Sequence, residues 1–455
     1  MNFSEYISLH KGKRVAVCGV GVSNMPLIRL LRARGISVEA RDKKDAAAMG
    51  EQAAELEGLG VKLIGGDSYL ENLTADIIYR SPGIRPDAGE LTKAHANGAI
   101  ITSEMEAFFD ICPCKIIAVT GSDGKTTTST LISETLKADG KKVWLGGNIG
   151  APLLDKTPDM AAEDLVVVEL SSFQLMTMKK PADIAVVTNI SPNHLDWHSS
   201  FEEYIDAKKN IFRGQSAKQK LVLNAVNDIT RGFANEACGN VSNFSLEGKV
   251  GRGAWFDGNS VFVTNGNETR KILDVSDIKI PGRHNIDNYM AVISALNGLV
   301  SDEAVFKVAR EFGGVEHRLE FVRELNGVKF YNCSISSSPS RTIADLKTFG
   351  EKVVLIAGGY DKKLPFEPLA EVLPAHVRKM VLIGATSDLI RTAAERVEGF
   401  PPIIQAESFE QAIYLAYEAA EGRGIVLLSP ACASFDLFPN FSVRGEVFKE
   451  IVQNL

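Results

Sequence analysis

The chain of 455 residues has few cysteines, no excess of basic residues and no long apolar run. Its six cysteines are scattered, and the pair Cys112 and Cys114 has no second pair at zinc-finger spacing, which argues against a structural metal site. This cysteine usage fits a reducing compartment. No apolar run approaches the ~20 residues that span a bilayer, and the first residues lack the apolar core of a secretion signal. We therefore expect a cytoplasmic protein without membrane insertion.

The charge balance excludes another class of partner. Lys and Arg total 50 against 57 Asp and Glu, a formal net charge of −7. A chain this acidic is a poor general binder of nucleic acid, so we expect no nucleic-acid partner. Any phosphate must therefore be bound locally, by a few well-placed groups. The hydrophobic fraction of 45% is that of a globular protein, and the length suggests about three domains.

Strands alternate with helical patterns along most of the chain, which predicts an α/β fold with three domains. Residues 1–110 are expected to form a Rossmann-like N-terminal domain. Residues 111–314 are expected to form a central P-loop domain with a parallel sheet and a small antiparallel excursion, and residues 315–455 a Rossmann-like C-terminal domain. The main predicted strands are Arg14–Cys18, Ser37–Ala40, Ile77–Tyr79, Lys115–Thr120, Leu165–Leu170, Ile184–Thr188, Lys220–Leu223, Gly253–Phe256, Ser260–Thr264, Val328–Tyr331, Val353–Ala357, Met380–Ile383 and Ile425–Leu428.

A phosphate-binding motif follows the apolar strand Lys115–Thr120. It is Gly121-Ser122-Asp123-Gly124-Lys125-Thr126-Thr127, and a helical pattern comes directly after it. Glycines let main-chain N–H groups converge on an anion, and the helix N-terminus adds partial positive charge. Lys125 would bind the β- and γ-phosphates, and Thr126 would bind Mg²⁺, with Thr127 as second choice. The alternative is a plain glycine turn with a solvated lysine. The loop has two residues between its glycines instead of four, which favours a particular ATPase branch over generic GTPases.

Three further polar residues are candidates for chemistry. Glu169 ends an apolar strand, where the side chain faces the crevice in which open α/β sheets bind ligands. His194 follows the strand Ile184–Thr188 and could be a ligand or a loop histidine satisfied by its neighbours. Lys208 lies on a predicted helix, and from the residues alone it is interpreted as a surface lysine.

Together these motifs resemble the Mur ligases of bacterial cell-wall synthesis. The resemblance covers nearly the whole chain and rests on several motifs that occur in the family's order. The motifs are Ser81-Pro82-Gly83-Ile84, Thr120 to Thr127, Gly147-Asn148-Ile149-Gly150, Glu169-Leu170-Ser171-Ser172-Phe173-Gln174-Leu175, His194-Leu195-Asp196-x-His198, Gly282-x-His284-Asn285, His317-Arg318 and Leu428-Ser429-Pro430-Ala431-Cys432-Ala433-Ser434-Phe435-Asp436 with Phe438 and Asn440-Phe441.

The resemblance implies an ATP-dependent ligase with UDP-binding, ATP-binding and amino-acid-binding domains. The last motif resembles the branch that adds D-glutamate to UDP-N-acetylmuramoyl-L-alanine through an acyl phosphate, in peptidoglycan precursor synthesis. Two Mg²⁺ sites are implied, as is a carbamate formed from CO₂ on Lys208, which reverses the interpretation of that residue as a surface lysine. We expect small-molecule substrates and a monomer.

The resemblance also implies a role for individual residues, with Lys125, His194 and Lys208 as the catalytic set. The expected ATP contacts are Gly121, Ser122, Asp123, Gly124, Lys125, Thr126, Thr127, Asn285, Asn288 and Arg318. The expected contacts to the UDP substrate are Gly19, Gly21, Val22, Ser23, Asp42, Ser81, Gly83, Asn148, Ser171 and His194. The expected D-glutamate contacts are Ser337, Lys362, Ser434, Phe435 and Phe441, and the expected metal ligands are Thr126, Glu169, His194 and Lys208.

Four alternatives differ in sequence features. A sister ligase adding L-alanine or a diamino acid remains open, although the Asn-Pro-Arg motif of the diamino-acid enzymes is absent. A folylpolyglutamate synthetase would share the central domain but would not need residues 19–23 or 429–434. A non-catalytic nucleotide-binding regulator would not need to retain Lys125, Glu169, His194 and Lys208. A serine hydrolase is excluded because the chain has no Gly-x-Ser-x-Gly elbow.

One position departs from the family's pattern, which has Asp where Cys333 stands and where the side chain approaches the nucleotide. A thiol cannot accept hydrogen bonds as a carboxylate does, so we expect weakened ATP binding or a substituted contact. Cys333→Asp is expected to lower the KM for ATP, measured by ADP release. An unchanged or higher KM would count against a lost contact. The loop's Asp123, where Asn is common, is a smaller departure without a physical explanation.

Overall fold

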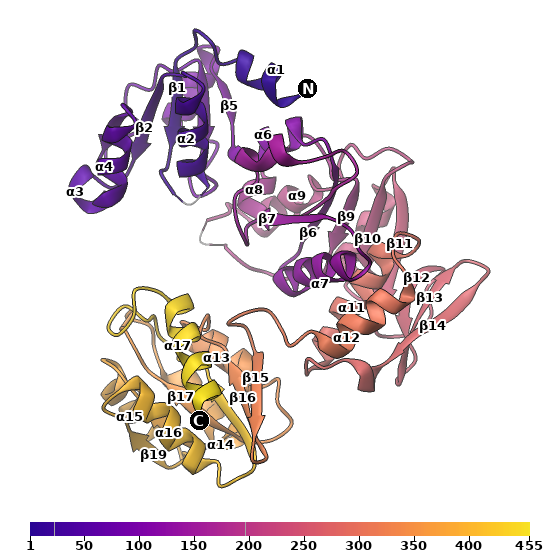
Figure 1. Cartoon of the computed structure of the whole chain (residues 1–455), viewed down its shortest axis with the longest axis vertical. Helices are drawn as coiled ribbons and strands as arrows, with labels where there is room; N and C mark the ends of the chain where they lie inside the picture. Colours follow the sequence, from indigo (N-terminus) through magenta and orange to yellow (C-terminus); the bar gives the residue numbers. More distant parts are fainter. Residues whose placement is uncertain (22, 196) are drawn as a thin grey trace. The chain divides into compact units, whose positions relative to one another are not determined.

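The computed structural model describes every residue except 22 and 196, and the chain packs into two compact units (Figure 1). One unit consists of Met1–Val275 with Ile286–Val308 and contains two sheets. The other unit consists of Ser276–Asn285 with Ala309–Leu455 and contains the third sheet.

The first sheet has five parallel strands in the order β3-β2-β1-β4-β5. All four residues of β1 are buried and apolar, as expected for a strand covered on both faces. The strand order changes direction at β1, with β2 and β3 on one side and β4 and β5 on the other. Sheets of this kind bind ligands at the carboxyl ends of the strands at this point. Its elements are α1 (Phe3–Ser8), β1 (Val15–Cys18), α2 (Asn24–Ala33), β2 (Val38–Asp42), α3 (Ala46–Met49), α4 (Glu51–Gly58), β3 (Lys62–Gly65), β4 (Ile77–Arg80), α5 (Gly89–Ala96), β5 (Ile100–Thr102) and α6 (Glu104–Ile111).

The second sheet has nine strands in the order β14-β13-β12-β11-β10-β9-β6-β8-β7. The strands from β7 to β12 pair in parallel, and β12, β13 and β14 pair antiparallel. Helix α7 packs on β6, β7 and β8. The elements are β6 (Lys115–Thr120), α7 (Lys125–Ala138), β7 (Val143–Gly147), η1 (Leu154–Asp159), β8 (Leu165–Glu169), α8 (Ser172–Leu175), β9 (Ile184–Val187), α9 (Phe201–Lys209), β10 (Lys220–Asn224), α10 (Asp228–Gly232), η2 (Phe233–Asn235), β11 (Asn240–Ser245), β12 (Arg252–Phe256), β13 (Ser260–Asn265), β14 (Thr269–Asp274), η3 (Val275–Asp277), α11 (Arg283–Leu296) and α12 (Asp302–Glu311).

The third sheet has six strands in the order β15-β16-β20-β17-β18-β19, and only the edge strand β15 is antiparallel. Successive residues of β17 enter two different cores, Leu355 on one face and Val354 and Ile356 on the other. The elements are β15 (Glu320–Leu325), β16 (Val328–Asn332), α13 (Pro339–Leu346), β17 (Val353–Ala357), α14 (Glu367–His376), β18 (Val377–Leu382), α15 (Ser387–Ala394), β19 (Ile403–Gln405), α16 (Phe409–Ala419), β20 (Gly424–Leu428) and α17 (Phe441–Asn454).

The α/β fold predicted from the sequence is confirmed, including the parallel sheets and the antiparallel excursion after residue 252. The excursion extends the central sheet itself, because β12 pairs in parallel with β11 before β13 and β14 turn back. The first two sheets belong to one compact unit, so the boundary expected near residue 110 and the one near 314 stay predictions.

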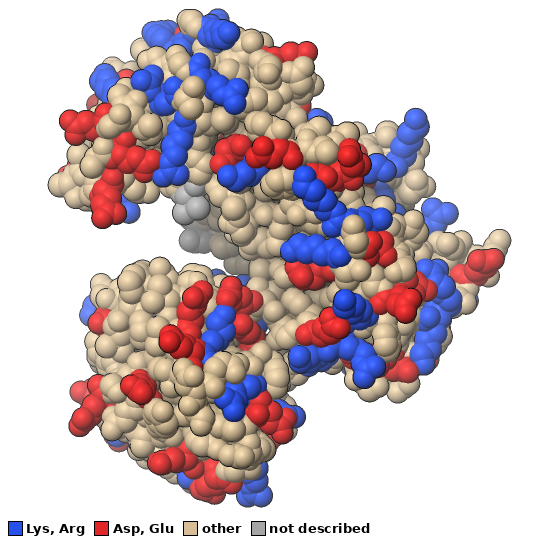
Figure 2. All heavy atoms as spheres, in the orientation of Figure 1, with Lys and Arg blue, Asp and Glu red and all other residues tan. Residues whose placement is uncertain are grey.

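The surface carries both signs of charge. Figure 2 shows basic and acidic side chains interspersed over the visible face, which matches the small net negative charge. Among the described residues, every helix is too short or too polar to cross a membrane.

Leu131 lies on α7 and is completely buried. Leu131→Ala is expected to lower the free energy of unfolding by about 2–5 kcal/mol, because it removes buried methyl groups and leaves a cavity. The urea midpoint, followed by circular dichroism, measures the change. The control Lys137→Ala lies on the same helix and loses only an exposed ion pair with Glu134, so its midpoint should stay near that of the parent protein. Equal midpoints for both variants would contradict the packing described.

Candidate active site

The phosphate loop joins β6 to α7 and depends on two glycines. Gly121 and Gly124 have φ of +151° and +77°, in the region that favours glycine. A Cβ on Gly121 would collide with Thr188 Oγ1, and one on Gly124 would lie 2.5 Å from Asn288 Oδ1. The loop is therefore both tightly turned and closely packed, and it brings the first N–H groups of α7 to the carboxyl end of the sheet.

The segment after β9 fastens this loop. Ser122 N–H donates to Asn189 O at 2.8 Å, and Ser122 Oγ donates to Ser191 O at 2.9 Å. Asp123 N–H donates to Asn189 Oδ1 at 2.9 Å. The side chain of Asp123 is exposed, so its negative charge is turned to solvent.

Two lysines share one carbonyl at the start of the loop. Lys125 Nζ donates to Gly121 O at 3.0 Å and to Ser122 O at 2.9 Å. Lys208 Nζ donates to the same Gly121 O at 2.8 Å and to Thr120 Oγ1 at 3.2 Å. Lys208 is 1% exposed and lies over the ring of Tyr204, so its interpretation as a surface lysine is wrong.

The pKa of Lys208 lies well below its ordinary value. Burial is the main cause, and the nearby charge of Lys125 acts in the same direction. The carboxylates of Glu169 and Asp123 oppose the shift without cancelling it. Lys208 is therefore disposed to be neutral, which is the form in which an amine is nucleophilic.

Glu169, at the end of β8, binds two other predicted site residues, Thr126 and Asn148. Its side chain is 1% exposed and accepts hydrogen bonds from Thr126 Oγ1 at 2.7 Å and from Asn148 Nδ2 at 2.8 Å. Asn148 N–H also donates to Glu169 O at 2.8 Å. A hydroxyl and a buried carboxylate side by side are oxygen ligands of the kind that Mg²⁺ prefers, so these residues fit the metal implied by the sequence.

The two histidines of the loop after β9 differ in environment. His194 is exposed, with φ of +55°, and its ring lies edge-to-face against Phe173. His198 is buried, with Nε2 at 2.9 Å from Ser172 Oγ and Nδ1 at 3.2 Å from Glu203 Oε2. His198 therefore packs the loop against α8, whereas the side chain of His194 is exposed.

The loop after β1 gathers several of the residues expected at the UDP substrate. Val20 N–H donates to Asp42 Oδ2 at 2.6 Å, and Gly19 N–H donates to Arg41 O at 2.7 Å. A Cβ on Gly19, where φ is +85°, would lie 2.5 Å from Ser81 Cβ. The glycine loop and the turn after β4 thus pack side by side at the carboxyl edge of the first sheet.

Three other residues of that expected set belong to the first sheet's loops, and Ser171 follows β8 of the second sheet. Ser23 is the N-cap of α2, and Gly21 and Gly83 are exposed. Ser171 is the N-cap of α8, and its hydroxyl accepts from Gln174 N–H at 3.2 Å. The expectation for Val22 falls on a residue outside those that the structure describes.

The residues expected at the adenosine lie in different units. Asn288 is buried in the first unit, next to Gly124, and its Oδ1 accepts from Thr128 Oγ1 at 3.2 Å. Asn285 and Arg318 belong to the second unit, where Asn285 Nδ2 donates to Pro281 O at 2.6 Å. The structure brings Asn288, but not these two, to the phosphate loop within one unit.

The second unit carries the residues expected at D-glutamate. Lys362 Nζ donates to Ser337 Oγ at 3.0 Å. The hydroxyl of Ser434 is buried and has no hydrogen-bond partner among the described residues, so it can accept or donate to a ligand. Phe435 and Phe441 are exposed, 64% and 40%.

Arg444 fixes this region. It is 3% exposed, and burial lowers its pKa to about 10. Its guanidinium donates to Ser334 Oγ and Ser334 O at 3.0 and 2.9 Å, and to Ala433 O and Cys432 O at 3.2 Å each. One side chain therefore ties the segment after β16 to the segment after β20, next to Ser434.

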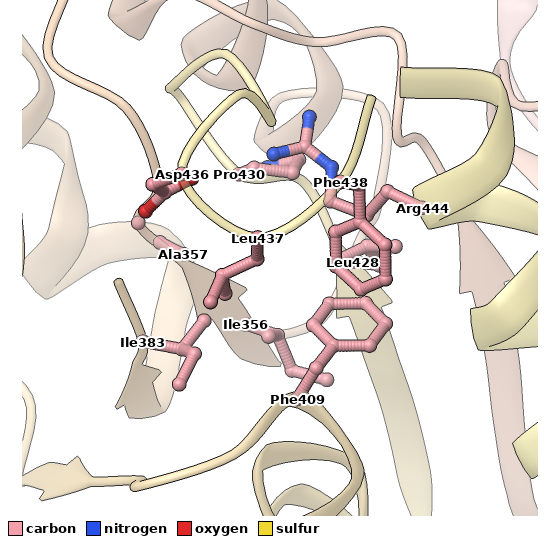
Figure 3. Close-up of a pocket in the computed structure, with 12 residues that line it drawn as sticks. Ile356, Ala357, Ile383, Phe409, Leu428, Pro430, Asp436, Leu437, Phe438 and Arg444 are labelled. Atoms are coloured by element: carbon pink, nitrogen blue, oxygen red, sulfur yellow. The ribbon is translucent and has the colours of Figure 1, made fainter. Parts of the chain in front are cut away.

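A small pocket lies behind the same segment (Figure 3). Its twelve lining residues are mostly apolar, with Asp436 and Arg444 as the charged ones. Such a lining suits a dicarboxylate poorly, because little on it would replace the water lost from the carboxylates. The polar group around Ser337, Lys362 and Ser434 is the better candidate for an acidic amino acid.

Cys333 is buried, 1% exposed, with its Sγ 3.3 Å from Ser336 Oγ. Its thiol also lies against the carboxylate of Asp345, and burial raises the pKa of both groups. Asp345 Oδ2 accepts from Ser429 Oγ at 2.7 Å. A second carboxylate at position 333 would therefore face Asp345, so Cys333→Asp is best compared with and without Asp345→Asn.

Sequence reasoning missed three buried residues near these sites: Arg80, His198 and Arg444. Arg80 ends a run of apolar strand residues, and that pattern alone could have drawn attention to it. His198 was noted only as part of a motif. The charged pattern around Arg444 does not indicate its burial, which depends in part on Ser334, 110 residues earlier in the chain.

Comparisons with known proteins agree with this geometry. The family model described as Mur ligase middle domain matches residues 119–296, and the one described as Mur ligase, glutamate ligase domain matches residues 317–432. A protein of Ruminiclostridium cellulolyticum named UDP-N-acetylmuramoylalanine–D-glutamate ligase is 51% identical over 452 residues, covering 98% of this chain and 97% of its own length. One of the same name from Clostridium botulinum is 49% identical over 459 residues, covering 100% and 99%.

Solved structures share the fold at low identity. The UDP-N-acetylmuramate-alanine ligase MurC of Thermotoga maritima has a TM-score of 0.57 at 17% identity, covering 97% of this chain and 99% of its own. E. coli FolC, solved with DHPP and ADP, has a TM-score of 0.54 at 15% identity, covering 77% and 92%. The relatives that are about 50% identical over the full chain, together with the two family models, show that the chain belongs to the Mur ligase family.

Proposed function

We propose that this protein joins D-glutamate to UDP-N-acetylmuramoyl-L-alanine at the expense of ATP, in the synthesis of a peptidoglycan precursor. The observation that carries the proposal is the similarity to ligases of that name along the whole chain, at 51% and 49% identity. The geometry of the candidate site supports it.

The phosphate loop would bind ATP. The N–H groups at the start of α7 can converge on the phosphates, and Lys125 can turn from its two loop carbonyls toward them. Asn288 beside Gly124, and Asn285 and Arg318 in the second unit, are the proposed neighbours of the adenosine. Phosphoryl transfer needs alignment and charge neutralisation more than covalent help, and these groups supply both.

Thr126, Glu169, His194 and a carbamylated Lys208 are the proposed metal ligands, with two Mg²⁺ sites. Magnesium bound there would neutralise charge on the phosphoryl group in transfer. The hydrogen bond from Thr126 to Glu169 already places two of these oxygens side by side. Asn148 fixes the other oxygen of Glu169, so the carboxylate is oriented before any ligand arrives.

Lys208 is the proposed carbamate. Its neutral amine nitrogen would attack the carbon of CO₂ and lose a proton, which leaves a carbamate anion. The low pKa of Lys208 supports this step because the ammonium form has no lone pair to use. The change places an anion beside Lys125, so that two opposite charges attract each other where an ammonium form of Lys208 would be repelled.

The UDP substrate would lie along the carboxyl edge of the first sheet, at Gly19, Gly21, Ser23, Asp42, Ser81 and Gly83, with Asn148, Ser171 and His194 at its muramoyl-alanine end. Its carboxylate would attack the γ-phosphorus of ATP, forming an acyl phosphate and releasing ADP. The amine nitrogen of D-glutamate would then attack the acyl carbon. A C–N bond forms, the C–O bond to phosphate breaks, and the amine proton is lost.

D-glutamate would be held in the second unit. Lys362 and Ser337, already 3.0 Å apart, suit its side-chain carboxylate, and the unpartnered hydroxyl of Ser434 offers a further hydrogen bond. Phe435 and Phe441 would cover the aliphatic part. A sister ligase that adds another amino acid, or a folylpolyglutamate synthetase-like ligase, is the second candidate, favoured only by the shared fold of MurC and FolC.

The proposed reaction predicts a double substrate requirement. Release of ADP and phosphate from ATP should occur only when UDP-N-acetylmuramoyl-L-alanine and D-glutamate are both present, as measured with a coupled ADP assay. The same assay with L-alanine, a diamino acid or a folate in place of D-glutamate is the control. Turnover with one of those compounds instead would move the assignment to the second candidate.

The carbamate predicts the behaviour of Lys208 variants. Lys208→Ala should lower kcat by at least about a hundredfold, since it removes a group that acts in the charged site. A short carboxylate such as acetate should restore part of the rate. Lys209→Ala is the matched control, because Lys209 is the next residue on α9 and its amine pairs with Glu236 and lies over the ring of Phe233, away from the phosphate loop's carbonyls. Full activity of Lys208→Ala would remove the carbamate from the mechanism.

A further inference from the structure

Arg80 is a fully buried cation at the end of β4. It is 1% exposed, and it follows three buried residues of the same strand. Burial lowers its pKa, while the nearby charge of Glu106 acts in the opposite direction. Removing a guanidinium from water costs free energy, and the hydrogen bonds of a buried arginine must offset that cost.

The hydrogen bonds of Arg80 go mainly to the turn that follows it. Nη1 donates to the carbonyl oxygens of Ser81, Pro82 and Ile84, at 3.3, 3.4 and 2.5 Å. The turn is closed by a bond from Ile84 N–H to Ser81 O at 3.0 Å. The guanidinium thus binds three carbonyls within four residues and holds the turn in its curved shape.

The turn held by Arg80 packs directly against the glycine loop that begins at Gly19. Ser81 N–H donates to Cys18 O at 2.8 Å, and the space next to Gly19 is filled by Ser81 Cβ. Gly83 and Ser81 are two of the proposed contacts to the UDP substrate. A shift of this turn would therefore change the width and the donors of the proposed nucleotide site.

The other side of the guanidinium is anchored outside the first sheet. Nη2 donates to Thr177 Oγ1 at 3.2 Å, and Thr177 Oγ1 donates to Glu106 Oε2 at 3.1 Å. Ser103 Oγ donates to the same oxygen at 2.8 Å. The chain of bonds ties the turn to α6 and to the segment after α8, so Arg80 cannot follow a displaced turn without breaking it.

We propose that Arg80 is a positioning residue for the nucleotide substrate: it holds the turn 81–84 in the shape that the UDP moiety binds, without touching the substrate. The inference rests on the proposed function for the identity of that substrate. A lysine at position 80 has one ammonium group with three N–H donors, which cannot donate to three carbonyls and to Thr177 at the same time.

The test compares Arg80→Lys and Arg80→Met with Arg32→Met. Arg32 lies in the same sheet domain and also donates to main-chain carbonyls, Leu59 O at 2.8 Å and Ile36 O at 3.0 Å, but far along the chain from the turn. The three variants therefore share the loss of an arginine that binds carbonyls. The readouts are the Kd for UDP-N-acetylmuramoyl-L-alanine and for a non-hydrolysable ATP analogue, by titration calorimetry, and the melting temperature.

Arg80→Lys should raise the Kd for the UDP substrate by about tenfold or more, the effect of losing a charged hydrogen bond. The Kd for the ATP analogue should stay unchanged, and Arg32→Met should leave both Kd values unchanged at a similar loss of melting temperature. Equal UDP-substrate Kd values for Arg80→Lys and the parent would overturn the inference, and so would an equal rise in Arg32→Met.

The isosteric variant Thr177→Val covers the case in which both Arg80 variants fail to fold. It removes one partner of the guanidinium at almost constant volume and should raise the Kd for the UDP substrate alone. No change in this variant would then overturn the inference. Failure of the parent protein to bind UDP-N-acetylmuramoyl-L-alanine would overturn the proposed function as well, which separates the two failures.

Discussion

Two amines on one carbonyl oxygen are the constraint on which the candidate site depends. Lys125 and Lys208 both donate to Gly121 O, at 3.0 and 2.8 Å, in a loop whose glycines leave no room for adjustment. Two ammonium groups this close repel each other, and the more buried one is less able to keep its proton. The pKa of Lys208 is therefore well below its ordinary value, through burial first and the charge of Lys125 second.

The second recurring device is a buried arginine that binds main-chain carbonyls. Arg80 does so in the first unit and Arg444 in the second. Each lies next to a segment rich in small residues or proline, Ser81 to Ile84 in the first unit and Pro430 to Ser434 in the second. A planar guanidinium can bind several carbonyls at once, so a single rigid side chain orders a segment that its own sequence leaves loose. Both segments carry residues proposed to contact substrates.

Local sequence patterns predicted much of the fold. Lys115–Thr120 and Val353–Ala357 are strands with the predicted bounds, because continuous apolar runs bounded by glycine are strong local signals. The pairing of β12 in parallel with β11 and antiparallel with β13 was not predicted, because a local strand pattern does not show in which direction a strand pairs with its neighbours. The phosphate loop could be located from spacing alone, whereas the burial of Lys208 could not, because α9 shows an ordinary charged pattern.

Cys333 shows why a position-by-position comparison is incomplete. By sequence it is a missing acid, and the expected consequence is weaker nucleotide binding. In the structure its thiol lies against the carboxylate of Asp345 from α13. That carboxylate also contacts Ser336 and Ser429 and lies within range of the charge of Arg318. An acid is thus present in this part of the unit, attached to a helix instead of to the strand end. Since a carboxylate acts through its charge and its hydrogen bonds, its position in space matters more than the residue number that carries it.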